Sequence, residues 1–244
     1  MAEVLDWRAD PDPNALLQRV AEVLHSGGTV AVPTEAGYLL IASALHGGVE
    51  TLRRIRPDEP LQLATAGLDE VAGWLKTRGT LTERLTRRLW PGLASLSVPV
   101  GERDRAALPG GVNDRLIDGE GRIRLACFGH SAYENRLMHG VGPPAFVELP
   151  AGGRFTPENL RERHGDELKL ILGDGEIASK RLTRVTVTGE GWAVERHGEV
   201  SEDEILRSAG RWFVFVCTGN TCRSPMAEGL FAARLAERLN CRVA

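Results

Sequence analysis

One short segment near the end of the chain carries residues of the types and spacing that a nucleophilic site needs. It reads Cys217-Thr-Gly-Asn-Thr-Cys-Arg-Ser224 and follows the apolar run Trp212–Val216. A continuous apolar run of this length is typical of a buried strand. Apolar residues at helical spacing come directly after the loop, so the sequence predicts a strand, a loop and a helix in succession.

This succession predicts a cradle for phosphate. Backbone N–H groups of such a loop converge on an anion at the positive end of the helix, and Gly219 permits close approach. The same field lowers the pKa of a thiol, so we expect Cys217 to be a nucleophile and Arg223 to bind two oxygens of the transferred phosphoryl group. The alternative, an ordinary buried cysteine at the end of a strand, does not account for the neighbouring residues.

The loop pattern Cys-x-Gly-Asn-x-Cys-Arg-Ser-Pro, continued by Met-Ala-Glu, resembles the opening of the low-molecular-weight protein tyrosine phosphatase family. This resemblance implies that Cys217 is the nucleophile, Arg223 the phosphoryl clamp and Cys222 a redox partner of Cys217. It implies that Asn220 and Ser224 orient the loop and the thiolate. The remaining residues of the phosphate loop are Thr218, Gly219 and Thr221.

Thr221 is similar to the threonine of the bacterial protein arginine phosphatases within this family. Phosphoarginine is therefore the favoured substrate, with phosphotyrosine left open, and a phosphoprotein is the expected partner of a complete domain. Family members place their general-acid aspartate far downstream. The resemblance thus implies that residues 211–244 are the truncated start of a phosphatase domain, either part of a longer fusion or a fragment that only binds phosphate.

The much larger preceding part contains hydroxyls and cations that are scattered along the chain. The segments that carry them are Val32-Pro-Thr-Glu-Ala-Gly-Tyr38, Arg53-Arg-Ile-Arg-Pro57 with Pro60-Leu61, Trp90-Pro-Gly92 with Ser95, Arg124, Thr183 and Arg196-His-Gly198. Each signal alone is equally well explained by a solvated helix end or a packed indole. Their order carries the argument.

That order resembles the YrdC-like threonylcarbamoyl-AMP synthase family over about residues 13–200. The resemblance implies a twisted mixed α/β sheet with a concave basic cavity. It also implies the conversion of threonine, bicarbonate and ATP, with Mg, to threonylcarbamoyl-AMP and pyrophosphate for tRNA modification. By position, the implied substrate and nucleotide residues are Thr34 and Tyr38 for threonine, Arg54 and Arg56 for phosphate, Ser95, and Arg124, Thr183 and Arg196 on the sugar-phosphate side.

One family motif is replaced in this chain. The Ser-x-Ser-Ala-Asn stretch, which contacts nucleotide in the family, aligns with Val147-Glu-Leu-Pro-Ala151. Glu148 would bring a carboxylate towards a phosphate pocket, where like charges repel. An alternative therefore stays open, in which this part is a non-catalytic module that binds nucleotide or double-stranded RNA and regulates the phosphatase.

Composition narrows the class of protein. The 244 residues are 42% hydrophobic and 26% charged, with a formal net charge of −3, so no global attraction to nucleic acid or membrane is expected. The sequence contains neither a long apolar run nor a signal-peptide pattern, which predicts a cytoplasmic protein. Four cysteines and six histidines lack metal-ligand spacing, so no transition-metal site is expected.

The periodicities predict an α/β (α+β) fold of two domains, residues 1–208 and 211–244. Helices are expected at 14–26, 48–55, 68–75, 81–89, 157–163 and 201–207. Strands are expected at 29–32, 38–41, 61–64, 95–98, 123–126, 145–149, 168–172, 184–187 and 192–195. Gly101–Gly121 is predicted to be an exposed loop, and the arginines at 84, 87 and 88 a solvated helix face rather than an RNA contact. The apolar run 212–216 is expected to pair with a strand, in this chain or in another copy.

Overall fold

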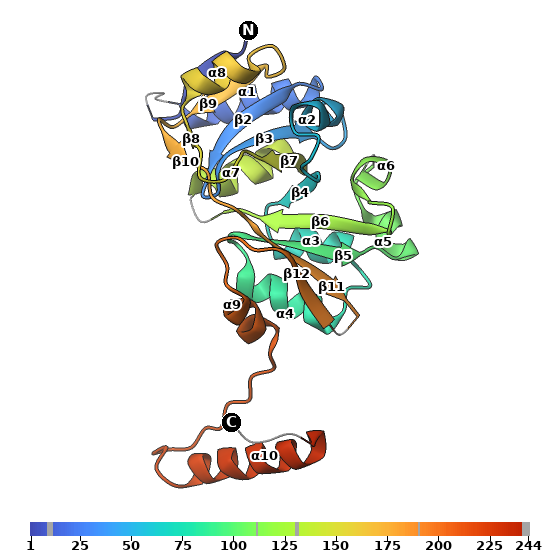
Figure 1. Cartoon of the computed structure of the whole chain (residues 1–244), viewed down its shortest axis with the longest axis vertical. Coiled ribbons are helices and arrows are strands. Elements are labelled where there is room, and N and C mark those ends of the chain that lie inside the picture. Colours follow the sequence, from blue (N-terminus) through green and yellow to red (C-terminus); the bar gives the residue numbers. More distant parts are fainter. Residues whose placement is uncertain (9–11, 111, 130–131, 190, 241–244) are drawn as a thin grey trace. The chain divides into compact units, whose positions relative to one another are not determined.

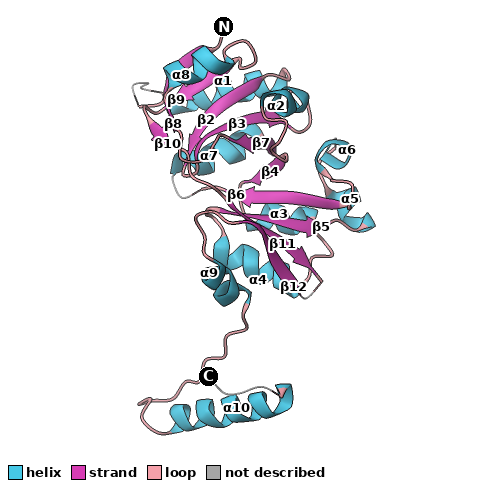
Figure 2. Ribbon diagram, in the orientation of Figure 1, coloured by secondary structure: helices cyan, strands magenta, loops and turns pink. Residues whose placement is uncertain are grey.

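The computed structural model describes residues 1–8, 12–110, 112–129, 132–189 and 191–240. Contacts divide the chain into two compact units, Met1–Ala209 (unit 1) and Gly210–Ala244 (unit 2). Figure 1 traces the elements along the chain, and Figure 2 shows the helices of unit 1 packed on its sheet.

Unit 1 is built on a sheet of mixed direction. Its strands, in sequence order, are β1 (Glu3–Asp6), β2 (Thr29–Thr34), β3 (Gly37–Ser43), β4 (Gln62–Thr65), β5 (Ala94–Pro99), β6 (Arg122–Cys127), β7 (Pro144–Glu148), β9 (Leu170–Gly173), β11 (Thr183–Thr188) and β12 (Gly191–Arg196). Their order across the sheet is β1-β9-β2-β3-β7-β4-β6-β5-β11-β12. Four neighbouring pairs are parallel and five antiparallel, as β2 with β9 and β2 with β3 illustrate. The predicted mixed α/β fold is confirmed. A separate two-stranded sheet joins β8 (Arg154–Phe155) and β10 (Ile177–Ala178).

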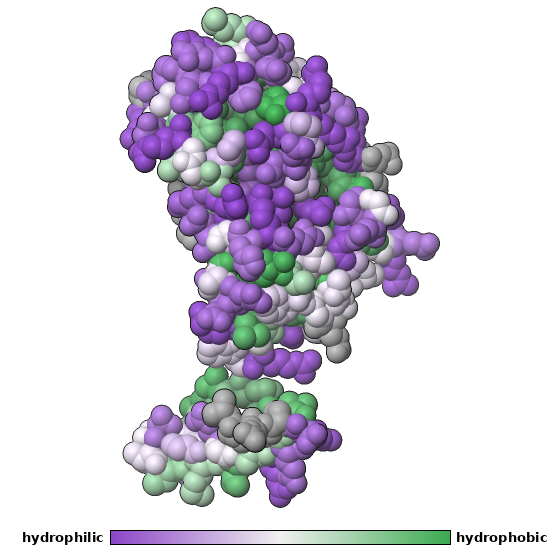
Figure 3. All heavy atoms as spheres, viewed as in Figure 1, coloured by the Kyte–Doolittle hydropathy of each residue, from purple (hydrophilic) through white to green (hydrophobic). Residues whose placement is uncertain are grey.

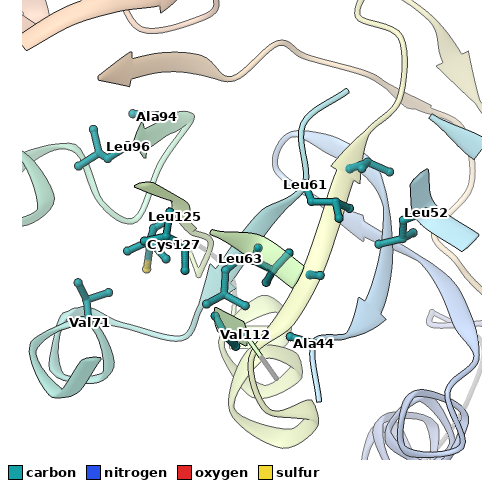
Figure 4. Close-up of a cluster of buried hydrophobic side chains, with 14 of the residues drawn as sticks. Ala44, Leu52, Leu61, Leu63, Val71, Ala94, Leu96, Val112, Leu125 and Cys127 are labelled. Carbon is teal, nitrogen blue, oxygen red and sulfur yellow. The ribbon is translucent and has the colours of Figure 1, made fainter. Parts of the chain in front are cut away.

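Helices cover both faces of this sheet. They are α1 (Pro13–His25), α2 (Val49–Ile55), α3 (Leu68–Trp74), α4 (Thr80–Leu89), α5 (Glu102–Ala107), α6 (Val112–Leu116), α7 (Ala132–Val141), α8 (Pro157–His164) and α9 (Glu202–Ala209). Alternate residues of a strand point to opposite faces, so the sheet feeds two apolar clusters. One cluster joins the strands to α1 and α7, and the other joins them to α2, α3 and α4. Figure 4 shows part of the second, with Leu63, Leu96 and Leu125 of three strands together with Leu52 of α2 and Val71 of α3.

The segment Gly101–Gly121 differs from its prediction as an exposed loop. It contains α5 and α6, and Leu108, Val112 and Leu116 are buried in the core. The buried carboxylate of Asp104 accepts hydrogen bonds from the Thr77 backbone N–H at 2.8 Å and from the Thr77 hydroxyl. This segment is rich in glycine, aspartate and arginine. The helices α5 and α6 therefore contain too few apolar residues to show a helical period in the sequence.

The arginines of α4 also have a more specific role than a solvated face. Arg84 Nε donates to the Ala209 carbonyl at 2.8 Å, and an Arg88 guanidinium nitrogen donates to the Ser208 carbonyl at 2.9 Å. The last carbonyls of a helix lack partners within it, so these two arginines cap the C-terminus of α9. Arg87 forms an ion pair with Glu83 at 2.8 Å.

Unit 2 consists of an extended segment, a loop and α10 (Arg223–Leu239). The predicted strand at 212–216 is wrong for this chain, because these residues form no strand and expose their apolar side chains; Val216 is 86% exposed. Residues 210–240, the described part of unit 2, contain no strand with which this segment could pair. Figure 3 shows hydrophobic residues on the surface of unit 2. The exposed apolar residues of α10 include Met226, Leu230 and Leu239. Pairing with another copy stays a prediction.

Candidate functional sites

The loop of unit 2 wraps around the sulfur of Cys217. The Asn220 backbone N–H donates to Cys217 Sγ at 3.1 Å, and the Ser224 hydroxyl lies 2.9 Å from the same sulfur. The Ser224 hydroxyl also donates to Asn220 Oδ1 at 2.6 Å. Asn220 adopts a left-handed backbone conformation with φ of 48°, which asparagine tolerates better than most residues. Asn220 and Ser224 thus form one polar unit with the thiol.

This polar unit changes the acidity of the thiol. Hydrogen bonds from the Ser224 side chain and backbone, and from the N–H groups of Asn220 and Gly219, outweigh desolvation and lower the pKa of Cys217 to about 7. The backbone N–H groups stabilise a negative sulfur by donating to it, and the Ser224 hydroxyl does the same when its single proton turns from Asn220 Oδ1 to the sulfur. Cys217 is therefore substantially a thiolate at neutral pH.

The thiol opens into a small pocket. The pocket has a volume of about 310 Å³ and is lined by Phe215, Val216, Cys217, Thr218, Arg223, Ser224 and Ala227. Arg223 is the first residue of α10, so a cation and the positive end of a 17-residue helix meet beside the sulfur. The structure brings together Cys217, Thr218, Arg223 and Ser224 around this pocket and places exposed Cys222 at the N-cap of α10.

The other cysteines lie in different surroundings. Burial, with a contribution from Glu35 and Glu70, raises the pKa of Cys127 to about 12, so this thiol stays neutral. Cys222 is a free and exposed cysteine. Cys241 lies outside the described residues.

In unit 1, the hydroxyls expected to bind threonine are used inside the fold. Thr34 donates to the Gly37 carbonyl at 2.8 Å and accepts from the Ala36 N–H at 3.2 Å. Tyr38 is fully buried, and its hydroxyl donates to the Gly175 carbonyl at 2.9 Å while it accepts from the Asp174 N–H at 2.8 Å. The Thr34 hydroxyl therefore holds the turn between β2 and β3, and the Tyr38 hydroxyl holds the backbone that follows β9.

Arg56 and Arg196, expected on the phosphate and sugar-phosphate sides of the site, meet carboxylates instead. A cluster that we call the carboxylate-arginine cluster contains Arg56, Glu59, Glu148, Arg184 and Arg196. Arg196 donates to both Glu148 oxygens, at 2.5 and 2.6 Å, and Arg184 donates to Glu148 Oε1 at 2.9 Å. Glu59 accepts from Arg184, from Arg196 at 3.2 Å and from Arg56 at 3.4 Å.

Glu148 itself is almost completely enclosed. Its side chain is 4% exposed, and it also accepts from Gln62 Nε2 and from the Leu182 N–H, both at 3.0 Å. Buried carboxylates are tolerated when they are paired and fully hydrogen-bonded, and Glu148 meets both conditions. The carboxylate of Glu148 thus faces arginines, and its negative charge is balanced by ion pairs within the chain.

The remaining predicted residues are dispersed around this cluster. Arg124 pairs with Asp118 at 3.1 Å and Glu195 at 3.6 Å, and Thr183 exchanges hydrogen bonds with the backbone of Val200. Ser95 is buried on β5, and its hydroxyl has no hydrogen-bond partner among the described residues.

Arg54 is exposed on α2 and donates to the Thr51 hydroxyl at 3.2 Å, within its own helix. The structure therefore joins Arg56 with Arg196 through Glu59 and leaves Arg54 outside the cluster.

Sequence reasoning missed Glu59 and Arg184. Glu59 lies in a short segment between two prolines, Pro57 and Pro60, and a solvated loop carboxylate gives the same signal. Arg184 is 10% exposed by its side chain, and a basic residue within the β-branched strand Thr183–Thr188 is the one signal that could have indicated a buried ion pair.

A pocket of about 420 Å³ adjoins the cluster at Glu59. Its lining residues are Arg53, Pro57, Glu59, Pro60, Leu61, Arg115, Leu116, Ile117, Asp118 and Arg124. Arginines, the carboxylates of Glu59 and Asp118, and apolar side chains line it together. Within the described part of the chain, no group of three or more histidine, cysteine or acidic residues is arranged to hold a metal ion, and no helix is long and apolar enough to cross a membrane.

Comparison with known families matches both units. Residues 22–115 match the family model of Sua5, YciO and YrdC, described as telomere recombination, and residues 213–244 match that of low molecular weight phosphotyrosine protein phosphatase. Both resemblances are confirmed. Unit 1 is hereafter the Sua5/YrdC-like unit and unit 2 the phosphatase-like unit.

Individual relatives agree with this division. Escherichia coli YciO superposes with a TM-score of 0.70 at 19% identity, over 84% of this chain and 98% of that one. P. abyssi Sua5 complexed with L-threonine gives a TM-score of 0.67 at 20% identity, over 86% of this chain and 61% of that one. These similarities establish the fold of the Sua5/YrdC-like unit.

The phosphatase-like unit has a curated relative. The protein-arginine-phosphatase of Bacillus subtilis strain 168 is 76% identical over 25 residues, which are 10% of this chain and 16% of that protein. The chain thus spans about one sixth of that phosphatase.

Proposed function

We propose that the phosphatase-like unit supplies the nucleophile of a cysteine-dependent protein phosphatase. The observation that carries this proposal is the Cys217 sulfur, which accepts the Asn220 N–H and lies beside the Ser224 hydroxyl, with its pKa lowered to about 7. The thiolate attacks phosphorus, the S–P bond forms, and the bond from phosphorus to the leaving oxygen or nitrogen breaks with its electron pair. Arg223 binds the phosphoryl oxygens, and water later releases phosphate from the cysteine.

Phosphoarginine is the favoured substrate and phosphotyrosine the other candidate. Thr221 and the 25-residue match to a protein-arginine-phosphatase support the first. The substrate would be a phosphoprotein in either case. Catalytic turnover of both needs a proton donor for the leaving group, which the described residues of this loop and helix do not supply.

The test uses a substrate whose leaving group needs no proton donor. With p-nitrophenyl phosphate at pH 7, we expect a burst of nitrophenolate of about one equivalent per chain and a phosphoryl group on the Cys217 peptide after an acid quench, seen by mass spectrometry. Cys217→Ser should remove both signals, and Cys222→Ser, the matched control, should keep them. An equal burst from Cys217→Ser would assign the reaction to another group.

We propose that the Sua5/YrdC-like unit, residues 1–208, is a threonylcarbamoyl-AMP synthase-like module that acts in the cytoplasm on threonine, bicarbonate and ATP with Mg for tRNA modification. Its fold and the order of its motifs support this. The residues proposed for its substrates are Thr34, Tyr38, Arg54, Arg56, Ser95, Arg124, Thr183 and Arg196.

A second candidate is favoured by the carboxylate-arginine cluster. Because Arg56 and Arg196 are paired with carboxylates, the module would bind nucleotide or double-stranded RNA without synthase chemistry and would regulate the phosphatase. Release of pyrophosphate from ATP, with and without threonine and bicarbonate, separates the two candidates. Threonine-dependent release that Arg56→Ala abolishes supports the synthase, and no release from a folded chain supports the second candidate.

A further inference from the structure

The carboxylate-arginine cluster contains more positive than negative groups. Three guanidinium groups, of Arg56, Arg184 and Arg196, share two carboxylates, so the cluster has a formal charge of +1. The Nε atom of each of these arginines is buried without a hydrogen-bond acceptor among the described residues. Donors therefore exceed acceptors at this point of the fold, which is unusual for buried polar groups.

Planar guanidinium groups bind carboxylates and phosphates with the same forked geometry. Three of them that converge from α2's C-terminal end, β11 and β12 make a donor set suited to a multiply charged oligophosphate. In this structure the partner oxygens come from Glu59 and Glu148 of the same chain.

We propose that Glu59 and Glu148 act as internal anions in an oligophosphate site, so that the site accepts a ligand only when a carboxylate leaves or is neutralised. This inference concerns regulation of the nucleotide side proposed above, but it rests on the contacts of the cluster and does not require synthase chemistry. It is also independent of Cys217.

The two carboxylates are held with unequal firmness. Glu148 is fixed by β7, where it pairs with Leu39 of β3, and by its bonds to Gln62 and Leu182. Glu59 lies on the loop after α2, is 17% exposed by its side chain and lines the 420 Å³ pocket. Glu59 is therefore the movable anion, and the pocket is the route by which an oligophosphate reaches the arginines.

The experiment measures the binding of tripolyphosphate by calorimetry. The full chain carries Arg223→Ala in every sample, which weakens anion binding at the phosphatase-like loop. Glu59→Gln should bind tripolyphosphate at least about tenfold more tightly than the chain with Glu59, because one carboxylate charge no longer opposes the phosphates. Adding Arg196→Ala should abolish the gain. Glu176→Gln is the matched control, because Glu176 pairs with Arg154 and neither residue belongs to the cluster or lines the pocket, and it should leave the affinity unchanged.

Circular dichroism establishes that each variant is folded. Glu148→Gln provides a second variant if Glu59→Gln fails to fold, and the same gain is expected because its amide keeps an acceptor for the Leu182 N–H. The proposal is overturned if the folded variant binds no more tightly than Glu176→Gln, or if Arg196→Ala leaves the gain intact. Since tripolyphosphate cannot form an adenylate, either result is separate from the outcome of the pyrophosphate assay.

Discussion

The two units hold their arginines and their reactive groups in opposite ways. In the Sua5/YrdC-like unit, Arg196 lies against the buried carboxylate of Glu148, at 2.5 and 2.6 Å from its oxygens. In the phosphatase-like unit, Arg223 faces an open pocket together with the Cys217 thiol. An arginine that matches a family motif therefore indicates where an anion belongs, but the anion can be a ligand or another part of the chain.

The difference follows from how each site is assembled. The phosphatase-like loop places donors around one sulfur within eight consecutive residues, so local backbone geometry is sufficient. The carboxylate-arginine cluster joins residues that are far apart in the chain, such as Glu59 and Arg196, which are 137 positions apart. Its charge balance depends on every one of the elements that meet there.

Removal of the Glu148 carboxylate should produce the largest effect, a loss of folding stability in the Sua5/YrdC-like unit. Glu148→Leu leaves three guanidinium groups, including that of the 10% exposed Arg184, to share the Glu59 carboxylate, and should lower the free energy of unfolding by about 3–5 kcal/mol in urea denaturation. The matched control is Glu195→Leu at a more exposed pair, with an expected loss of less than about 1 kcal/mol. Equal losses would show that the cluster has no special role in stability.

A change in the phosphatase-like loop should alter the reactivity of Cys217 rather than the stability of the fold. Ser224→Ala removes the hydrogen bond that contributes most to the lowered pKa of Cys217, so the pH midpoint of its alkylation by iodoacetamide should rise from about 7 by about one pH unit. Mass spectrometry of the Cys217 peptide gives the rate at each pH, and buried Cys127 should remain unlabelled. Thr218→Ala removes another hydroxyl of the loop and should leave the pH midpoint of alkylation unchanged. A pH midpoint that Ser224→Ala leaves unchanged would contradict the role assigned to the Ser224 hydroxyl in lowering the pKa of Cys217.

A smaller effect should come from the pH dependence of Glu59. Burial alone would raise the pKa of Glu59, but the hydrogen bond from Arg184 and the charges of Arg184, Arg196 and Arg56 lower it below 4.5. A lowered carboxyl pKa stabilises the folded state above the unfolded pKa, and this contribution disappears as the pH falls through the folded pKa. The difference in unfolding free energy between the wild type and Glu59→Gln should thus be constant from neutral pH to near 5 and shrink below about 4.5. A difference that grows on acidification would reverse the sign assigned to these contacts.

Much of the fold could be predicted from periodicity, and the exceptions have physical causes. The helix α1 and the strands β2 and β3 follow the apolar spacing of their residues closely. The strand β1 was not predicted, because Glu3–Asp6 has two charged ends and is extended by pairing with β9, far along the chain. The apolar run 212–216 predicts a strand but forms none. The apolar pattern shows that a segment can be buried, but a strand also needs a neighbouring strand to pair with.

The sites differ in the same respect. The contacts among Cys217, Asn220 and Ser224 lie within one motif, so their sequence spacing was informative. For Thr34 and Tyr38, the residue types matched a binding motif, but the backbone groups that take up their hydroxyls could not be identified without the fold.

The two arginine caps on α9 bear on how the chain responds to a protease. Arg84 and Arg88 hold the carbonyls of Ala209 and Ser208, so the Sua5/YrdC-like unit is tied down to its last residue. Arg211 follows within two residues and is exposed, in a stretch without helix or strand. Trypsin should cut there early, and the released fragment of residues 1–211 would keep α9 capped and melt as a single cooperative body.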